Sequence, residues 1–252
     1  MNELEFYNQQ FDKYKKYDRQ RIEGRELNLD RAEGYFEHLV KSYSDLQGTL
    51  LDLGCGDGYF TSRFAKFNDA VIGIEPSSLI NAGNELLEAE KLNNVKFLKE
   101  DAYKLSLDDD SVELVMSRRG PDPENEVFRV LKRDGLFIFI TIGEKDCYSL
   151  KEIVGRGQHF GSSDKVSEQL KSKFKKAGFA DVLCKDFIYE DDFSSSEDLK
   201  EFLHQVPIFD NYSKADYPSI DAYCERYEES SIKLDRHRVV LLARKSANRN
   251  RS

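Results

Sequence analysis

The sequence predicts an α/β fold in which helices cover both faces of a mostly parallel sheet. Apolar stretches of strand length alternate with stretches at helical spacing from residue 49 to residue 245. A glycine-rich turn follows the first of these strands, as is typical where a parallel strand leads into a helix. Because the chain has no internal repeat and no linker rich in Pro or in Gly and Ser, we expect one core.

The strands and helices follow from the spacing of the apolar residues. In the first half of the chain, strands are predicted at 49–53, 70–75, 95–99, 112–117 and 135–142, with helices at 58–67 and 78–92. In the second half, a helix at 167–179 with Gly178 as its stop signal precedes a strand at 180–189. A capped helix at 194–206 is stopped by Pro207, and the last strand is predicted at 237–245.

Two irregular regions are expected to be appendages of the core, which spans 46–245. Residues 1–45 are polar with a helical pattern, and we expect them to form an N-terminal lid. Residues 189–232 hold twelve Asp or Glu and three Lys or Arg, so this insertion carries the whole formal net charge of −9. Both regions are expected to lie over the carboxyl ends of the strands, where open α/β sheets bind ligands. Residues 246–252 are expected to be a disordered tail.

Composition and cysteine spacing exclude several classes of protein. No apolar run approaches the roughly 20 residues of a membrane helix, and the amino-terminal residues do not have the pattern of a secretory signal. The four cysteines are far apart, with no C-x-x-C pair and no nearby histidine, so we expect free thiols and no metal site. These features predict a cytoplasmic protein without a membrane partner.

The strongest motif is LLDLGCGDGYF at 50–60, where a strand turns into a helix. Glycines at 54, 56 and 58 allow positive φ angles and let a ligand lie against the backbone. The start of the next helix points free N–H groups into the same turn. A dinucleotide-binding fingerprint requires a third glycine where this chain has Tyr59, so that motif does not fit.

Three acidic residues specify the ligand further. Asp52 precedes the glycines, where a carboxylate suits an ammonium group better than a pyrophosphate. Glu75 ends the second strand, at the position where a carboxylate binds two ribose hydroxyls. Asp101 follows the third strand and can accept a hydrogen bond from an adenine amino group. This pattern describes a cationic nucleoside that carries an amino acid, and S-adenosylmethionine matches that description.

The segments DLGCGDG, IEPS, EDA and VELVMS together resemble the class I S-adenosylmethionine-dependent methyltransferases. The resemblance implies a Rossmann-like, seven-stranded sheet whose last strand is antiparallel, with S-adenosylmethionine as the cofactor. The SRRGP segment at 117–121 further resembles a bacterial subgroup of this family. The cofactor pocket implied by the family comprises Asp52, Gly54, Cys55, Gly56, Gly58, Glu75, Pro76, Asp101, Ala102 and Ser117.

The segment after the fourth strand, SRRGPDPE at 117–124, is expected to face the methyl group. It lacks both the Asn/Asp-Pro-Pro-aromatic motif of adenine methylation and the Pro-Cys of cytosine methylation. Arg118 and Arg119 are the candidate functional residues there, and His159 is a third candidate. One arginine either holds an anionic substrate or the cofactor carboxylate, or both arginines pair with acidic neighbours at 122, 124 and 126. Since neighbouring side chains point to opposite sides, at most one arginine is expected to face the pocket.

Three functions remain open at this point. A methyltransferase acting on a small molecule is favoured by the acidic insertion and by the absence of an added nucleic-acid module. An RNA methyltransferase of the rRNA guanine type is the alternative, with the basic stretch 13–25 and the paired arginines holding phosphates. The third is a cofactor-binding protein without catalysis. The oligomeric state is left open.

Overall fold

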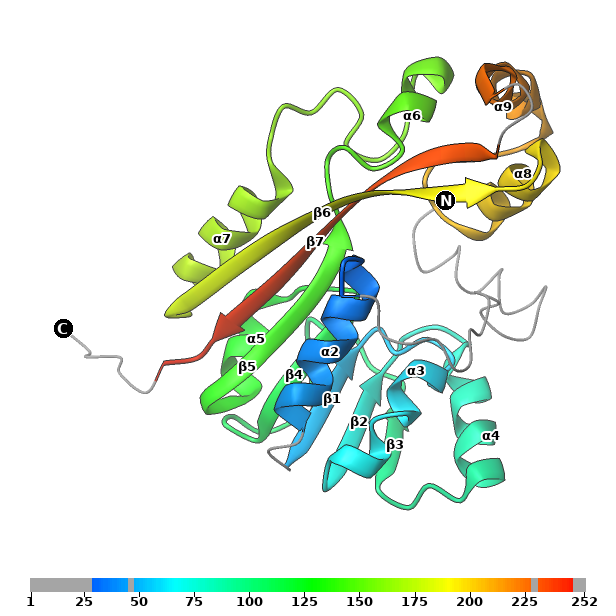
Figure 1. The fold of residues 1–252 in the computed structure, drawn as a ribbon. Helices are drawn as coiled ribbons and strands as arrows, with labels where there is room; N and C mark the ends of the chain where they lie inside the picture. Colours follow the sequence, from blue (N-terminus) through cyan, green and yellow to red (C-terminus); the bar gives the residue numbers. More distant parts are fainter. Residues whose placement is uncertain (1–28, 45–47, 228–230, 247–252) are drawn as a thin grey trace.

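A seven-stranded sheet forms the centre of the computed structural model, which describes residues 29–44, 48–227 and 231–246 (Figure 1). The strand order is β3-β2-β1-β4-β5-β7-β6, and β7 runs antiparallel to both of its neighbours. The other neighbouring strands pair in parallel, which confirms the predicted fold class. The strands are β1 (Thr49–Leu53), β2 (Ala70–Ile74), β3 (Val95–Leu98), β4 (Val112–Arg118), β5 (Leu131–Ile142), β6 (Asp181–Phe193) and β7 (Ile232–Arg244).

Helices cover both faces of the sheet because alternate strand residues point to opposite sides and both sides are apolar. The helices are α2 (Ala32–Ser44), α3 (Tyr59–Ser62), α4 (Ile80–Glu90), α5 (Glu124–Val130), α6 (Tyr148–Val154), α7 (Val166–Lys176), α8 (Ser196–Gln205) and α9 (Tyr217–Cys224). Leu51 and Leu53 of β1 belong to a buried cluster with α5 and α7, whereas Leu50 belongs to a cluster with α2, α3 and α4. Of the helices described, none is long and apolar enough to cross a membrane.

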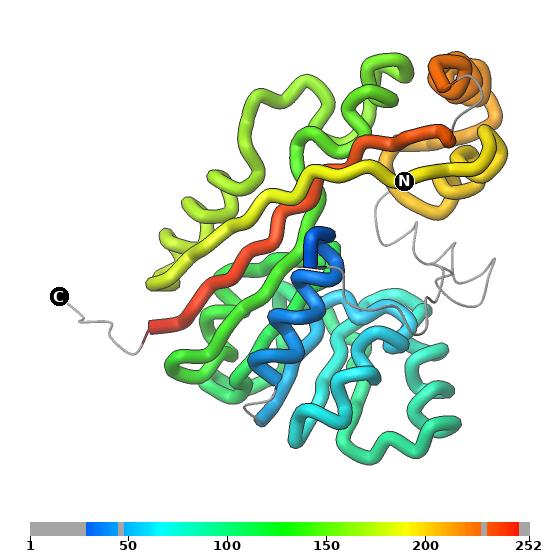
Figure 2. The backbone as a smooth tube through the Cα atoms, viewed as in Figure 1, coloured from blue at the N-terminus to red at the C-terminus, as the bar shows by residue number. Residues whose placement is uncertain are grey.

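Helix α2 is part of the core. Ala32, Phe36 and Val40 are fully buried against the sheet face formed by β4, β5 and β7, and Figure 2 shows the helix lying along that face. Its apolar residues recur at intervals of four, as expected for a helix with one buried face. The prediction of a lid is therefore corrected for residues 29–44. For residues 1–28, which lie outside the described part of the chain, it stays a prediction.

The acidic insertion is shorter than expected, because β6 continues to Phe193 and β7 begins at Ile232. Between them, α8 and α9 pack with α6 around a separate apolar cluster beyond the ends of these two strands (Figure 1). Helix α8 begins with a side-chain cap, in which the Ser195 hydroxyl accepts the N–H of Asp198 at 3.1 Å. Since β6 is parallel to β1, the insertion follows the same edge of the sheet as the glycine turn. The predicted tail falls outside the described residues from residue 247 onward.

Candidate functional site

The glycine turn connects β1 to α3 and is tied to the end of β2. The N–H groups of Gly54 and Cys55 both donate to the carbonyl oxygen of Ile74, at 2.9 and 3.0 Å. Gly56 has a φ of +59°, and a Cβ there would meet no atom of the described residues within 4 Å. A Cβ at Gly58, in contrast, would collide with the Phe97 ring at 2.3 Å. Gly58 is therefore required by packing, whereas Gly56 borders open space where a ligand can approach the backbone.

Asp52 is the buried carboxylate beside this turn, and it is 3% exposed. Its Oδ2 accepts a hydrogen bond from the Thr61 hydroxyl at 2.5 Å, while its Oδ1 is buried without a hydrogen-bond partner among the described residues. Burial raises the pKa of Asp52 to about 6, although Thr61 and Arg118 act in the opposite direction. Leaving a buried acceptor unsatisfied is unfavourable, so an incoming ammonium group would be stabilised at Oδ1. The side chain therefore fits the cationic amino-acid end of the predicted cofactor.

Glu75 and Asp101 lie at the same sheet edge as Asp52, because β1, β2 and β3 run parallel and in register. The Glu75 carboxylate accepts the N–H of Gly56 at 3.1 Å and the N–H of Ser77 at 2.8 Å. It therefore connects the turn after β1 to the turn after β2. Asp101 is exposed and accepts the N–H of Tyr103 at 2.9 Å. The predicted hydrogen bonds of Glu75 to the ribose and of Asp101 to the adenine are compatible with these positions and stay predictions.

The remaining predicted cofactor residues differ in what they offer to a ligand. The Cys55 thiol is buried beneath Gly73, where a Cβ would approach its sulfur to 2.8 Å, and burial raises its pKa. Ser117 is also buried, and its hydroxyl donates to the Pro121 carbonyl oxygen at 2.8 Å. Both side chains thus face the protein. Pro76 is exposed, and Ala102 is buried in the cluster that includes α5 and α7.

The paired arginines at the end of β4 have different partners. The Arg118 guanidinium stacks 4.1 Å from the centre of the Phe60 ring and is close enough to Asp52 to lower the pKa of that carboxyl. Arg119 has a φ of +58°, and its Nη1 donates to Oε1 of Glu33 at 3.3 Å. Arg118 is the one that acts on Asp52, and the expectation that at most one arginine faces the pocket stays a prediction.

The acidic residues after the arginines are paired with other cations, which corrects one expectation. Lys173 of α7 binds Asp122 and Glu124 at 2.9 and 3.2 Å, and Arg129 binds Glu126 at 2.9 Å. These contacts fasten the loop to α5 and α7. The alternative in which these carboxylates pair with Arg118 or Arg119 is wrong for the described residues, because their ion pairs are with Lys173 and Arg129.

His159 lies in the loop between α6 and α7 and is exposed, with a φ of +60°. Partial desolvation of its ring and the charge of Lys151 lower its pKa. Its charged neighbours, Glu144, Asp146 and Lys151, all follow β5 rather than β1. Its role as a catalytic residue stays a prediction.

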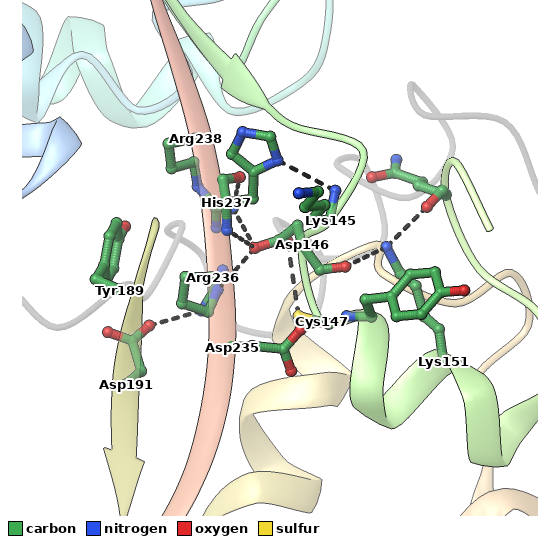
Figure 3. A network of polar contacts seen from close by, with 12 residues as sticks. Lys145, Asp146, Cys147, Lys151, Tyr189, Asp191, Asp235, Arg236, His237 and Arg238 are labelled. Atoms are coloured by element: carbon green, nitrogen blue, oxygen red, sulfur yellow. Dashed lines mark hydrogen bonds and ion pairs between the residues drawn. The ribbon is translucent and has the colours of Figure 1, made fainter. Parts of the chain in front are cut away.

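A buried polar network at the ends of β5 and β7 was not anticipated (Figure 3). Oδ1 of Asp146 accepts hydrogen bonds from Arg236 Nε at 3.0 Å, from Arg238 Nη1 at 2.5 Å and from the N–H of His237 at 3.0 Å. Burial alone would raise the pKa of Asp146, but Arg238 and Arg236 outweigh it and lower the pKa to about 2. The signal for this network is the run Arg-His-Arg at 236–238, directly before the apolar residues 239–243 of β7.

The raised pKa of Asp52 makes ligand binding at this site dependent on pH. Only the ionised carboxylate attracts an ammonium group, and a carboxyl with a pKa of about 6 is mostly protonated at pH 5. We therefore expect the affinity for S-adenosylhomocysteine to fall about tenfold from pH 7 to pH 5. Calorimetric titrations at both pH values measure this change. Asp52→Asn is the control, and it should bind weakly with little dependence on pH; an equal slope in both proteins would contradict the assignment.

Comparison with protein families identifies a match over most of the chain. A family model described as a methyltransferase domain matches residues 45–205. A methyltransferase of Dictyostelium discoideum is 31% identical over 112 residues, which cover 42% of this chain and 41% of that relative. The malonyl-[acyl-carrier protein] O-methyltransferase of Bacillus cereus is 25% identical over 219 residues, or 74% of this chain and 77% of the other. The chain thus spans about two fifths of the first relative's length.

Solved structures share the fold. The YcgJ protein of Bacillus subtilis superposes with a TM-score of 0.60 at 16% identity, over 86% of this chain and 100% of the other. This likeness concerns the arrangement of helices and strands alone. The residues described above, rather than the likeness, connect the fold to a ligand.

Proposed function

The chain belongs to the methyltransferase-domain family, and from this premise we propose that it transfers a methyl group from S-adenosylmethionine to a small-molecule acceptor. The domain is of the class I, S-adenosylmethionine-dependent type, with the Rossmann-like sheet of that class. The observation that carries the proposal is the buried Oδ1 of Asp52, which has no hydrogen-bond partner among the described residues. Asp52 comes just before the glycine turn, in which Gly56 borders open space.

In this proposal, each residue at the glycine turn and the neighbouring strand ends binds a different part of the cofactor. Asp52 holds the ammonium group, and Arg118 is close enough to hold the carboxylate of the same amino-acid end. The backbone at Gly56 lies against the nucleoside, Glu75 binds the ribose hydroxyls, and Asp101 accepts from the adenine amino group. When bound, the cofactor supplies a methyl group on a positively charged sulfur, which is a reactive electrophile.

The protein's contribution to the reaction is mainly alignment. Holding an acceptor atom in line with the methyl group removes much of the entropic cost of bringing the two together. The rigid edge formed by the ends of β1 and β4 suits this task, since Arg118 is stacked on Phe60 and Asp52 is hydrogen-bonded by Thr61. Arg118 is therefore proposed as a cofactor ligand, and Arg119, which pairs with Glu33, is proposed to act on the acceptor side.

Charge supports a small molecule over RNA. Phosphate contacts need accessible basic side chains, but Arg236, at the same edge of the sheet, is buried and paired with Asp146 and Asp191. The insertion beyond this edge carries the acidic excess of the chain. The basic stretch 13–25 lies outside the described residues. We also propose a cytoplasmic location, which the four unpaired cysteines support.

The acceptor class can be tested with cofactor labelled on its methyl group. We expect purified protein, incubated with this cofactor and a fractionated cell extract, to move label into the small-molecule fraction, and the Asp52→Asn protein to move much less. Label that is lost on ribonuclease treatment would contradict the small-molecule proposal. Label on protein would contradict it too, and would point to an acceptor carried by a protein, as the name of the Bacillus cereus relative describes for that enzyme.

A further inference from the structure

A chain of alternating charges runs along the edge of the sheet next to the proposed cofactor site. In order, it consists of Arg31, Asp191, Arg236, Asp146, Arg238, Glu33 and Arg119, each within ion-pair distance of the next. Guanidinium groups stand at both ends of this chain, and the Arg119 side chain at its last position is 16% exposed. A partly buried guanidinium group is suited to the binding of a carboxylate.

The weakest link in this chain is at Glu33, in the first turn of α2. Asp191 and Asp146 hold their arginines at 2.5 to 3.0 Å. Oε1 of Glu33 lies 3.3 Å from Arg119 Nη1 and 3.8 Å from Arg238 Nε, beyond ordinary distances for charge-assisted hydrogen bonds. The Arg238 side chain is 3% exposed, and its Nε has no hydrogen-bond partner among the residues that the structure describes.

The side chains that surround the Glu33 carboxylate, namely Arg119, Arg238 and Tyr189, can bind a carboxylate group. Besides the two guanidinium groups, the Tyr189 hydroxyl donates to Oε2 of Glu33 at 2.9 Å. Burial and the charge of Glu33 raise the pKa of Tyr189, so the hydroxyl keeps its proton at neutral pH. The Glu33 side chain is 37% exposed, so a solute can reach the position that its carboxylate occupies.

The position of this group relates it to methyl transfer. Arg119 directly follows Arg118, whose guanidinium is near Asp52, and β4 pairs with β1 next to the glycine turn. A ligand bound by Arg119 would therefore lie at the same sheet edge as the cofactor. Arg119 directly follows the last residue of β4, and Arg238 lies in the middle of β7 opposite Ile142, the last residue of β5, so the two arginines come from different strands.

We propose that Arg119 and Arg238 bind a carboxylate of the methyl acceptor, and that Glu33 occupies this place until the acceptor arrives. The inference rests on the proposed methyltransferase function and adds the chemical class of its acceptor, an organic acid. The acceptor's carboxylate displaces the Glu33 carboxylate, because it can form shorter hydrogen bonds to Arg119 and Arg238 than Glu33 does. The first turn of α2, which carries Glu33, moves to make room for it.

The test is a calorimetric titration with succinate in the presence of saturating S-adenosylhomocysteine. We expect Glu33→Gln to bind succinate at least tenfold more tightly than the unchanged protein, because the competing internal carboxylate is gone. Glu37→Gln is the matched control on the same helix, where the carboxylate pairs with Arg63 and Lys41, and its succinate affinity should not change. A purely structural role for Glu33 would lower stability without increasing the affinity for an anion.

One further variant and two further ligands test whether the bound group is a carboxylate and whether Arg119 binds it. Arg119→Gln should abolish succinate binding whether or not Glu33 is present, and neutral succinamide should not bind. The proposal is overturned if Glu33→Gln binds succinate no more tightly, if succinamide binds equally well, or if inorganic phosphate binds in place of succinate. The heat of S-adenosylhomocysteine binding, measured on the same samples, tests the cofactor assignment independently of these outcomes.

Discussion

The Gly56→Val protein is expected to fold and to lose nearly all affinity for S-adenosylmethionine. A Cβ at Gly56 meets no described atom within 4 Å, so the valine does not collide with the protein itself. The φ of +59° makes a branched side chain unfavourable by roughly 1–2 kcal/mol, which lowers stability without unfolding the domain. In the ligand-bound state the valine occupies the space of the nucleoside, which should weaken binding by about 3 kcal/mol, or roughly a hundredfold.

Calorimetry with S-adenosylhomocysteine measures this loss, and thermal unfolding separates it from strain. Gly161→Val is the matched control, because Gly161 has a φ of +77° and equally open surroundings in the loop between α6 and α7. We expect this variant to lose similar stability and to keep its affinity. If Gly56→Val bound as tightly as Gly161→Val, the ligand would not lie against the glycine turn.

A large loss of stability is expected for Asp146→Asn. The substitution keeps the shape of the side chain but leaves the buried guanidinium groups of Arg236 and Arg238 opposite a neutral amide. Breaking a buried ion pair from one side costs about 3 kcal/mol or more. For a chain of this size, that corresponds to a fall of roughly 6–12 °C in Tm, measured by thermal unfolding.

The control for this variant is Asp109→Asn, because Asp109 also pairs with an arginine, Arg129, but is 74% exposed. A surface pair of this kind contributes less than about 1 kcal/mol. The pKa of Asp146 is about 2 in the folded protein, below its value of about 3.9 in an unfolded chain. Its contribution is therefore complete above pH 4 and is lost as the pH falls toward 2. Equal Tm values for both variants would show that the network is not stabilising.

The parts of the fold that local patterns specify were predicted well. Strands β1 to β4 begin and end within one residue of the predicted ranges, because their apolar runs are bounded by turn residues. Helix α6 was not predicted, since its N-terminus depends on a distant residue. Asp235 of β7 accepts the N–H of Tyr148 at 2.6 Å, and no local pattern in the sequence reveals such a cap. The face of the sheet that α2 covers is likewise decided by tertiary packing.

The candidate site also contains residues that the sequence predicts and residues that only the tertiary structure reveals. Asp52, Gly56 and Glu75 could be predicted, because the ends of parallel strands meet at one edge and the acidic residues follow those ends. Glu33 could not, because it reaches Arg119 across 86 residues of sequence. Only the packed sheet brings α2, β4 and β7 together, so the group around Glu33, which we propose binds an anion, can be recognised only in the structure.

The central claim is that the glycine turn and Asp52 form a site for S-adenosylmethionine. Its most direct test is a pair of calorimetric titrations of the unchanged protein at pH 7, one with S-adenosylhomocysteine and one with NAD. We expect saturable binding of S-adenosylhomocysteine at one site per chain and no measurable binding of NAD, because Tyr59 stands where a dinucleotide fingerprint has its third glycine. Tight binding of NAD with no response to S-adenosylhomocysteine would contradict it.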